Sequence, residues 1–404
     1  MIGVIADDLT GAAELGAVAW HHGLTAEVVL DRGSVSTDSA VVCLDTHSRS
    51  QTALEAARRA AAAAARMQEA GMEWVYKKTD SVLRGQVVAE LNAVLQQLGL
   101  KRALLLPANP GLGRVIRDGR YFINGQPLDQ TEFARDPEYP RKSAFVSELL
   151  SVPAGPAVQV CQRGTPLPDS GIMVGEVDSL IALNEWAACR SPDMLLAGGA
   201  QFFAALLAAA GHRVKRPASA NALAPGGSGR ELFVCGTTSN SGLDFVQNAR
   251  TRGTPVFSLP AELARGGDFR PAAVDALARR AAEALLKNRR AILCVGLPQV
   301  AEASIAQRLA VQLAKAAEAV LNLTDVDDIY AEGGATALEL AVRMGWARLK
   351  VVGELSLGVA TLAVDGPRPG RLTVKPGSYV WPASVQNPAP QAAPTFGGGI
   401  PQQL

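Results

Sequence analysis

Short apolar runs that end in polar clusters alternate with longer segments of helical periodicity along this chain. The first run, Ile2–Ala6, leads directly into Asp7 and Asp8, and an apolar-patterned segment follows from Thr10 to Trp20. This order of strand, loop and helix repeats, and such repetition is typical of a mostly parallel sheet with helices on both faces. We therefore predict an α/β fold whose ligands bind beyond the carboxyl ends of the strands.

The first part of the chain contains most of these units. Strands are predicted at 26–30, 40–44, 74–78, 103–106, 157–161, 172–177 and 194–197, and helices at 52–70, 86–98, 179–189 and 200–210. One segment departs from the repeat, because residues 121–128 contain Asn124-Gly125, a pair that adopts the positive φ angles of a type I′ turn at little cost. We expect an antiparallel hairpin there, followed at 131–137 by a polar segment that is either functional or a solvated loop.

The composition changes in the middle of the chain and at its end. Residues 217–229 are rich in proline, alanine, serine and glycine, which is typical of an interdomain linker. A second series follows, with strands predicted at 231–235, 255–259, 291–295, 328–331, 349–352, 358–364 and 372–374 and helices at 271–287, 301–320 and 337–344. We predict two α/β domains, 1–216 and 230–382, each a mostly parallel sheet flanked by helices, and a mobile tail at 383–404.

Length and charge exclude several classes of protein. At about 150 residues per domain, 404 residues fit two or three domains. The 39 basic and 38 acidic side chains give a net charge of +1, so neither nucleic acid nor a membrane is indicated as a partner. Five widely spaced cysteines, mostly within apolar runs, indicate reduced core residues. With no signal-peptide pattern and no apolar run near the roughly 20 residues of a membrane span, we expect a cytoplasmic protein, with a homodimer as an open alternative.

Polar side chains gather after the predicted strands of the first domain. The segment 77–85 supplies two lysines, Asp80, Ser81 and Arg84 at one strand end. An arginine fork suits a carboxylate or phosphate, and a lysine supplies a mobile charge. Together with Asp7, Asp8, Asn109, Arg120 and Arg135, these side chains predict a crevice for a small acidic, hydroxylated molecule. In the simpler interpretations, Asp80 and Arg84 pair across a helical turn and Asp8 or Thr10 only caps a helix.

Three glycine-containing turns stand out in the second domain, at 236–242, 333–336 and 374–379. The first two place small residues and free backbone N–H groups at the start of a helix, where phosphates bind, and Lys375 adds a cation to the third. None has the Walker A sequence or the three-glycine Rossmann spacing. Three such turns in one domain favour nucleotide binding. The four histidines lack metal-ligand spacing, and no Gly-x-Ser-x-Gly elbow of a serine hydrolase is present.

Three blocks carry a family resemblance. Residues 5–12 (Ile-Ala-Asp-Asp-Leu-Thr-Gly-Ala), residues 77–85 (Lys-Lys-Thr-Asp-Ser-Val-Leu-Arg-Gly), and Asn124-Gly125 followed by residues 131–137 (Thr-Glu-Phe-Ala-Arg-Asp-Pro) resemble the signature blocks of the four-carbon acid sugar kinase family. Its members phosphorylate threonate, erythronate or 3-oxo-tetronate with ATP. The resemblance extends from Ile2 to about Gly377 and implies two α/β domains, the first for the sugar acid and the second for the nucleotide.

The resemblance implies roles for individual residues. Asp8 and Arg84 match the sugar-acid site, with Asp7, Lys78, Asp80 and Ser81 in support, and the ATP positions match Ser239, Gly333, Gly334, Thr336 and Gly377. Two positions depart from the family pattern: Ala335 replaces an acidic residue that could have helped hold Mg²⁺ or ribose, and Pro376 in the last block lacks a backbone donor.

We therefore predict an ATP- and Mg²⁺-dependent sugar-acid kinase. Asp8 is expected to act as the base or orienter of the attacking hydroxyl, with Lys78 and Arg84 as cationic catalytic residues, while no metal ligand is assigned. Asp7, Asp80, Ser81, Asn109 and Arg135 are expected to bind substrate, and Ser239, Gly333, Gly334, Ala335, Thr336, Lys375 and Gly377 to bind nucleotide. Closure of the two domains across the linker would exclude water. A binding protein without catalysis and a nucleotide-independent isomerase or aldolase stay as alternatives.

Overall fold

The computed structural model describes residues 1–30, 33–35, 37–136, 138–152, 158–215, 229–237, 239–260, 262, 271–296, 303–364 and 370–387. The predicted linker up to residue 228 and the predicted tail from residue 388 lie outside these residues. So do Pro137, Thr238 and the first residues of the predicted strand at 157 and the predicted helix at 301.

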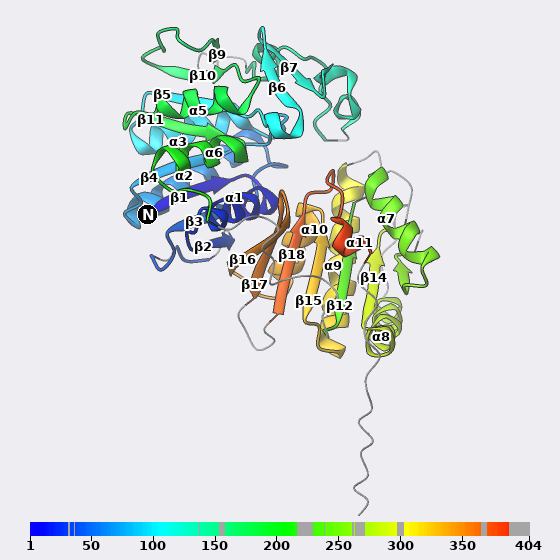
Figure 1. Ribbon diagram of the computed structural model, residues 1–404. Helices are drawn as coiled ribbons and strands as arrows, with labels where there is room; N and C mark the ends of the chain where they lie inside the picture. Colours follow the sequence, from blue (N-terminus) through cyan, green and yellow to red (C-terminus); the bar gives the residue numbers. More distant parts are fainter. Residues whose placement is uncertain are drawn as a thin grey trace, which may run out of the picture.

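The first half is a parallel sheet covered on both faces by helices (Figure 1). Its strands are β1 (Ile2–Ala6), β2 (Ala26–Leu30), β3 (Val41–Asp45), β4 (Trp74–Lys78), β5 (Arg102–Leu106), β9 (Val158–Cys161), β10 (Gly171–Gly175) and β11 (Met194–Gly198), in the order β2-β3-β1-β4-β11-β5-β10-β9. Its helices are α1 (Leu9–His21), α2 (Ala53–Glu69), α3 (Val87–Leu98), α5 (Leu180–Ala188) and α6 (Ala200–Ala209). Strands β1, β2 and β3 are buried along their whole length, which explains their continuous apolar runs.

A small antiparallel sheet lies beside the first half. It contains β6 (Arg114–Arg117), β7 (Arg120–Ile123) and β8 (Gln126–Pro127). Asn124 and Gly125 have φ angles of 50° and 80°, so the predicted hairpin is confirmed. The remaining elements here are the 3₁₀ helices η1 (Pro110–Leu112), η2 (Leu128–Gln130) and η3 (Glu132–Arg135) and the short helix α4 (Val146–Leu149).

The second half is a mixed sheet. Its strands are β12 (Glu231–Cys235), β13 (Val256–Ser258), β14 (Arg290–Cys294), β15 (Asp328–Glu332), β16 (Arg348–Ser356), β17 (Val359–Val364) and β18 (Gly370–Lys375), and its helices are α7 (Asn240–Thr251), α8 (Pro271–Asn288), α9 (Ala303–Leu323), α10 (Gly334–Arg343) and α11 (Ala383–Gln386). The order β13-β14-β12-β15-β18 is parallel, whereas β18, β17 and β16 form an antiparallel meander. Residues 383–386 differ from the predicted mobile tail, because α11 buries Val385.

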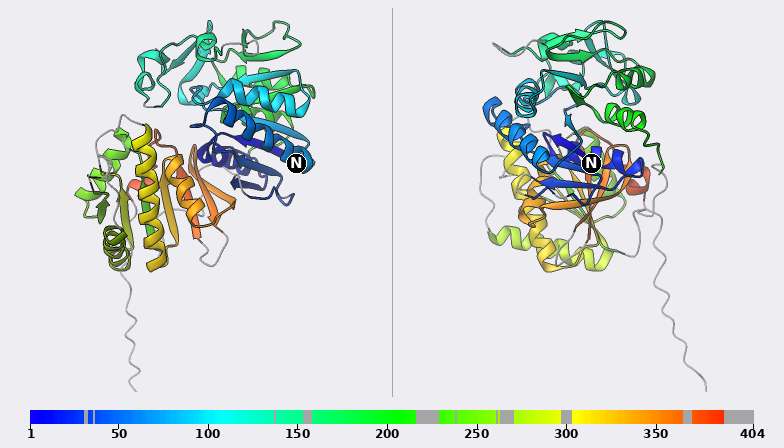
Figure 2. Two further views of the ribbon diagram at one scale, coloured as in Figure 1. Left: turned by 180° about the vertical axis from the view of Figure 1, so that it is seen from behind. Right: turned by 90° about the vertical axis from the view of Figure 1, so that its left-hand side faces the viewer.

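Strand pairing joins the two halves into one sheet of 15 described strands. Three residue pairs, Arg348–Val29, Leu349–Val28 and Lys350–Glu27, connect β16 to β2 in antiparallel register. In Figure 1 and in Figure 2, the strands of the second half run at a steep angle to those of the first. The pairing of β16 with β17 has two register irregularities. Such bulges increase the local twist of a strand, which fits the change in strand direction between the halves.

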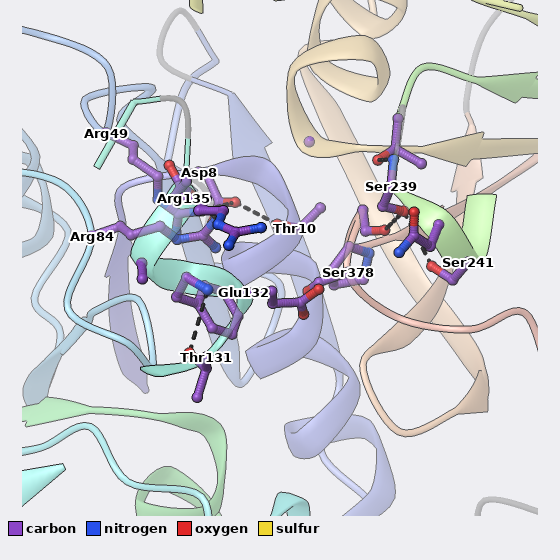
Figure 3. Close-up of a pocket in the computed structure, with 18 of the residues that line it drawn as sticks. Asp8, Thr10, Arg49, Arg84, Thr131, Glu132, Arg135, Ser239, Ser241 and Ser378 are labelled. Carbon is purple, nitrogen blue, oxygen red and sulfur yellow. Dashed lines mark hydrogen bonds and ion pairs between the residues drawn. The ribbon is translucent and has the colours of Figure 1, made fainter. Parts of the chain in front are cut away.

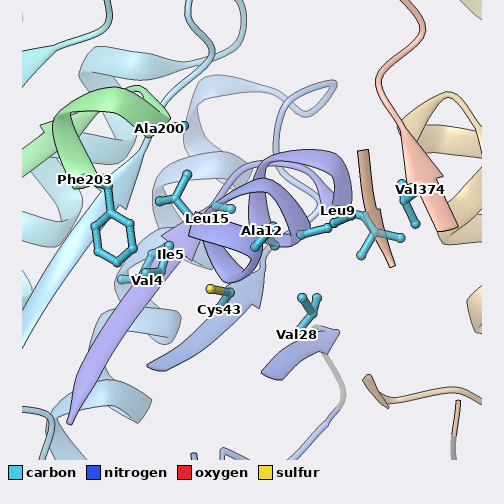
Figure 4. Packing of buried hydrophobic residues seen from close by; sticks show 14 of the residues in the cluster. Val4, Ile5, Leu9, Ala12, Leu15, Val28, Cys43, Ala200, Phe203 and Val374 are labelled. Carbon is cyan, nitrogen blue, oxygen red and sulfur yellow. The ribbon is translucent and has the colours of Figure 1, made fainter. Parts of the chain in front are cut away.

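Helix α1 packs against both halves. It contacts β2 and β3 of the first half and β16, β17 and α10 of the second. Figure 4 shows Ala12 close to Cys43, and Leu9 extending toward Val374 of β18. A Cβ atom added to Gly16 would lie 2.7 Å from Val351 of β16, so glycine permits this close approach. The loop before α1 is therefore held in place by the core of both halves.

Candidate functional site

A cavity of about 1020 Å³ lies where the carboxyl ends of the two sets of strands meet. It has three sides (Figure 3). The first half supplies a charged wall, here defined as Asp8, Arg49 and Arg84, together with Thr10. The second half supplies a glycine-turn wall, defined as Ser239, Gly334 and Gly377, with neighbouring residues 237, 240, 241, 376 and 378. Residues 129–136, here called the flap, form the third side.

Asp8 both caps α1 and faces the cavity. Its backbone is extended, and its Oδ1 accepts the Gly11 N–H at 2.9 Å. Its Oδ2 accepts hydrogen bonds from the Thr10 hydroxyl and from Arg49 Nη1, the latter at 2.7 Å. The capping and crevice interpretations of this carboxylate are therefore compatible. Asp7 is 2% exposed and lies beneath the cavity, because successive side chains leaving a strand point to opposite sides.

Arg49 links these two carboxylates. Its Nε and Nη2 donate to Asp7 Oδ2 and Oδ1, both at 2.8 Å, in a bidentate pair. Burial alone would raise the pKa of Asp7, but Arg49 holds the pKa of that carboxyl below its usual value. Arg49 is not among the site residues predicted from the sequence. The available signal was its position in the polar segment after β3, because β3 pairs directly with β1.

Arg84 is anchored by two carboxylates. Its Nη2 lies 2.8 Å from Asp80 Oδ1, and its Nη1 lies 3.2 Å from Asp136 Oδ2 in the flap. The predicted Asp80–Arg84 pair exists, but it spans a loop and not a helical turn, since α3 begins at Val87. Burial raises the pKa of Asp80, whereas Arg84 and Arg49 together hold it well below its ordinary value. Asp80 is therefore a charged support of the wall.

Three other residues expected at the substrate lie outside the cavity. Lys78 is 4% exposed, and its Nζ lies 3.3 Å from Glu14 Oε2 of α1. The Ser81 hydroxyl accepts a hydrogen bond from Arg114. Asn109 is also buried, and its Oδ1 accepts the Gln201 N–H at 3.3 Å. The structure brings Asp8, Arg84 and Arg135 to the cavity, with Asp7, Asp80, Lys78, Ser81 and Asn109 around them.

The glycine-turn wall contains the starts of two helices. Ser239 caps α7, accepting the Gly242 N–H at 3.3 Å, and donates to the Gly377 carbonyl at 2.9 Å. Gly334 begins α10 after Gly333, whose φ is 95°. A Cβ atom added to Gly334 would lie 3.3 Å from Asp8 Oδ2, so the two walls nearly touch there. Ser239, Gly334 and Gly377 line the cavity, whereas Gly333, Ala335, Thr336 and Lys375 do not.

Lys375 supports its turn from below and does not offer a free ammonium group. Its Nζ donates to the carbonyls of Pro376 at 3.0 Å and Tyr379 at 2.5 Å and lies 3.4 Å from Glu332 Oε1. Burial raises the pKa of Glu332 and lowers the pKa of Lys375, and each charge opposes the shift of the other. The expected cation thus lies beside this glycine turn, but the turn carbonyls and Glu332 bind it and it does not line the cavity.

Neither a metal centre nor a membrane span is found among the described residues. These residues contain no group of three or more histidine, cysteine, aspartate or glutamate side chains placed to hold a metal ion. None of the described helices combines the length and apolar character that a membrane span requires.

Comparisons with known proteins agree with the resemblance seen in the sequence. Residues 2–164 match the model of the sugar-binding N-terminal domain family. The chain is similar to the D-threonate kinase of Salmonella typhimurium, with 33% identity over 49% of this chain and 51% of that protein. It is also similar to the 3-oxo-tetronate kinase of Methylobacterium radiotolerans, with 26% identity over 94% of this chain and 96% of that protein. The match to the D-threonate kinase thus spans about half the length of that relative.

A solved structure from Salmonella typhimurium LT2 has the same fold. Its TM-score is 0.73 at 19% identity, and the match covers 94% of this chain and 96% of that chain. The N-terminal family model and the named relatives agree with the resemblance of this chain to four-carbon acid sugar kinases.

Proposed function

We propose, from this relationship to the four-carbon acid sugar kinases, that the chain is an ATP-dependent kinase that phosphorylates a hydroxyl group of a threonate, erythronate or 3-oxo-tetronate type acid. One observation carries the proposal: a single cavity has carboxylate and guanidinium groups on one wall and glycine turns at helix starts on the other. The first wall suits an acidic, hydroxylated molecule, and the second suits phosphates. In this proposal the two halves are the predicted sugar-acid and nucleotide domains.

The glycine-turn wall fits a nucleotide. The N-termini of α7 and α10 face the cavity through Ser239 and Gly334, and helix N-termini attract anions through free N–H groups and the helix dipole. Gly334 and Gly377 line the cavity without a side chain of their own. Mg²⁺, when bound, would neutralise phosphate charge. Carboxylates of the cavity lining, such as Asp129 and Glu132, have the oxygen chemistry that this ion prefers.

The residues of the charged wall have distinct proposed tasks. Asp8 Oδ2 orients the substrate hydroxyl and accepts its proton, in the place now taken by the Thr10 hydroxyl. Arg49 keeps this carboxylate oriented. Arg84, which is already fixed by Asp80, directs its guanidinium toward the carboxylate end of the acid. Phosphoryl transfer depends on this positioning and on charge neutralisation more than on covalent chemistry by the protein.

A panel assay tests the proposal. ADP release is measured with threonate, erythronate and 3-oxo-tetronate in all stereoisomers, with ATP and Mg²⁺, and the phosphorylated acid is identified by mass spectrometry. The proposal requires an acid that yields ADP and its phosphate ester in equal amounts. Product formed without ATP would point to a nucleotide-independent enzyme, and acid binding in calorimetry without ATP binding would point to a binding protein. Sedimentation of the same sample distinguishes a monomer from the homodimer that the sequence analysis left open.

A further inference from the structure

We infer that Arg135 of the flap is a catalytic residue that contacts the transferred phosphoryl group, and not a clamp for the carboxylate of the acid. This inference rests on the proposed kinase function. Phosphoryl transfer places negative charge on three equatorial oxygens, and an arginine aimed at them accelerates transfer strongly.

The other cations near the cavity are already paired. Arg49 is bound by Asp7 and Asp8, and Arg84 by Asp80 and Asp136. The two lysines that the sequence suggested are buried away from the cavity, Lys78 against Glu14 and Lys375 against Glu332. Neighbouring carboxylates partly offset the field of a paired guanidinium and occupy its N–H groups. It therefore attracts an incoming anion less strongly than a free guanidinium does.

Arg135 differs from these cations. It is exposed and lines the cavity, and within the described part of the chain it forms no ion pair or hydrogen bond, not even with Glu132 in the same 3₁₀ turn. Figure 3 shows Arg135 and Glu132 extending from η3 into the cavity between the two walls. Its guanidinium is therefore the uncommitted cation among the described lining residues.

The backbone that carries Arg135 is held on both sides. Phe133 is 7% exposed, and the guanidinium carbons of Arg84 and Arg114 lie 5.8 and 5.7 Å from the centroid of its ring. Asp136 binds Arg84, and the Arg141 N–H donates to the Phe133 carbonyl at 2.9 Å. A free side chain on a fixed backbone can be aimed at a developing charge with little reorganisation.

Arg135 assists the transfer of the γ-phosphoryl group from ATP to the acid. The substrate hydroxyl oxygen forms a bond to the γ-phosphorus of ATP, and its proton passes to Asp8. The bond between the γ-phosphorus and the β,γ-bridging oxygen breaks, and ADP leaves with the electron pair. Arg135 donates hydrogen bonds to the equatorial oxygens of the phosphoryl group during transfer.

Steady-state kinetics of Arg135→Ala test the assignment. We expect kcat to fall by about 10³-fold or more, with the KM of the acid within about threefold of wild type. Arg135→Lys should recover part of kcat. Binding of ADP with aluminium fluoride and the acid, a mimic of the transferring phosphoryl group, should weaken in parallel with kcat. Arg117→Ala is the matched control, because Arg117 is exposed on the neighbouring hairpin and outside the cavity lining.

Two results would overturn the assignment. An Arg135→Ala enzyme with wild-type kcat has no need of this cation, and a large rise in the KM of the acid at unchanged kcat would make Arg135 a substrate clamp. Failure of the kinase proposal is distinguishable from both, since the wild-type enzyme would then release no ADP with any acid of the panel, and the assignment would fall with it.

Discussion

Arg49 Nη1 lies 2.7 Å from Asp8 Oδ2, while the other two nitrogens of the same guanidinium hold Asp7. The carboxylate that faces the cavity is thus oriented by a residue from a different strand end. The Asp8 Oδ1 atom accepts the Gly11 N–H, and Oδ2, which also accepts the Thr10 hydroxyl, is the oxygen that Arg49 orients.

Replacing Arg49 with lysine should impair catalysis although the charge is kept. A lysine cannot form the bidentate fork, so Asp8 would lose its fixed orientation. We expect kcat/KM to fall by about 10²-fold, since misplacement by about 1 Å can have such an effect. Arg58→Lys is the control, because that side chain is 68% exposed on α2. Equal kinetics for both variants would contradict the orienting role.

Replacing Asp8 with asparagine separates the two tasks of this residue. Asparagine caps helices as well as aspartate does, so we expect the melting temperature to stay within a few degrees. Loss of the proton acceptor should lower kcat by about 10²-fold or more. Turnover within about threefold of wild type would show that Asp8 is not the base.

Removing the cation below the third glycine turn should destabilise the second half. Lys375→Met leaves Glu332, which is 0% exposed, without its ion-pair partner, and broken buried pairs cost about 3–5 kcal/mol of unfolding free energy. The double variant Lys375→Met/Glu332→Gln should recover much of this loss in urea unfolding. Lys350→Met, at an exposed position of β16, serves as control. A double variant no more stable than Lys375→Met would refute the pairing argument.

Because of Asp45, we expect the free energy of unfolding to decrease as the pH rises from about 4 to about 8. Burial and the charges of Asp8 and Asp7 raise the pKa of Asp45 to about 8, so over this range the folded state binds a proton that the unfolded state has lost. The stabilisation is fully present below about pH 4 and is lost as pH rises to about 8, by at most about 1.4 kcal/mol per pH unit. Urea titrations of Asp45→Asn should show a flatter pH profile, whereas exposed Asp169→Asn should follow wild type. Parallel profiles for Asp45→Asn and wild type would contradict this.

The order of the elements was predictable from the sequence. Strands buried on both faces are continuous apolar runs, whereas in helices the apolar residues recur every three to four positions. The ends of β1, β3 and β4 were identifiable as polar clusters. The pairing between these strands was not identifiable, and the role of Arg49 could therefore not be predicted, because its partners are 41 and 42 residues away along the chain. The burial of Lys78 and Lys375 was equally unpredictable. A lysine next to polar residues has the same local sequence pattern whether its ammonium group faces solvent or pairs with a buried carboxylate such as that of Glu14.

The junction between the halves was also not predictable. Pairing of β16 with β2 depends on twist and register over more than 300 residues, and no local signal encodes such a contact. A linker composition at 217–229 indicated two separate bodies, whereas α1 packs against strands of both.

The β2–β16 pairing affects how this protein can be divided into fragments for expression. A fragment that stops before β12 would turn β2 into a sheet edge and would uncover the face of α1 that packs on β16 and β17. Unpaired edges of this kind recruit other chains. The isolated N-terminal half is therefore a poor expression target, even though a family model describes much of it as a domain. Two fragments produced together should instead assemble, and the split protein would make activity depend on their association.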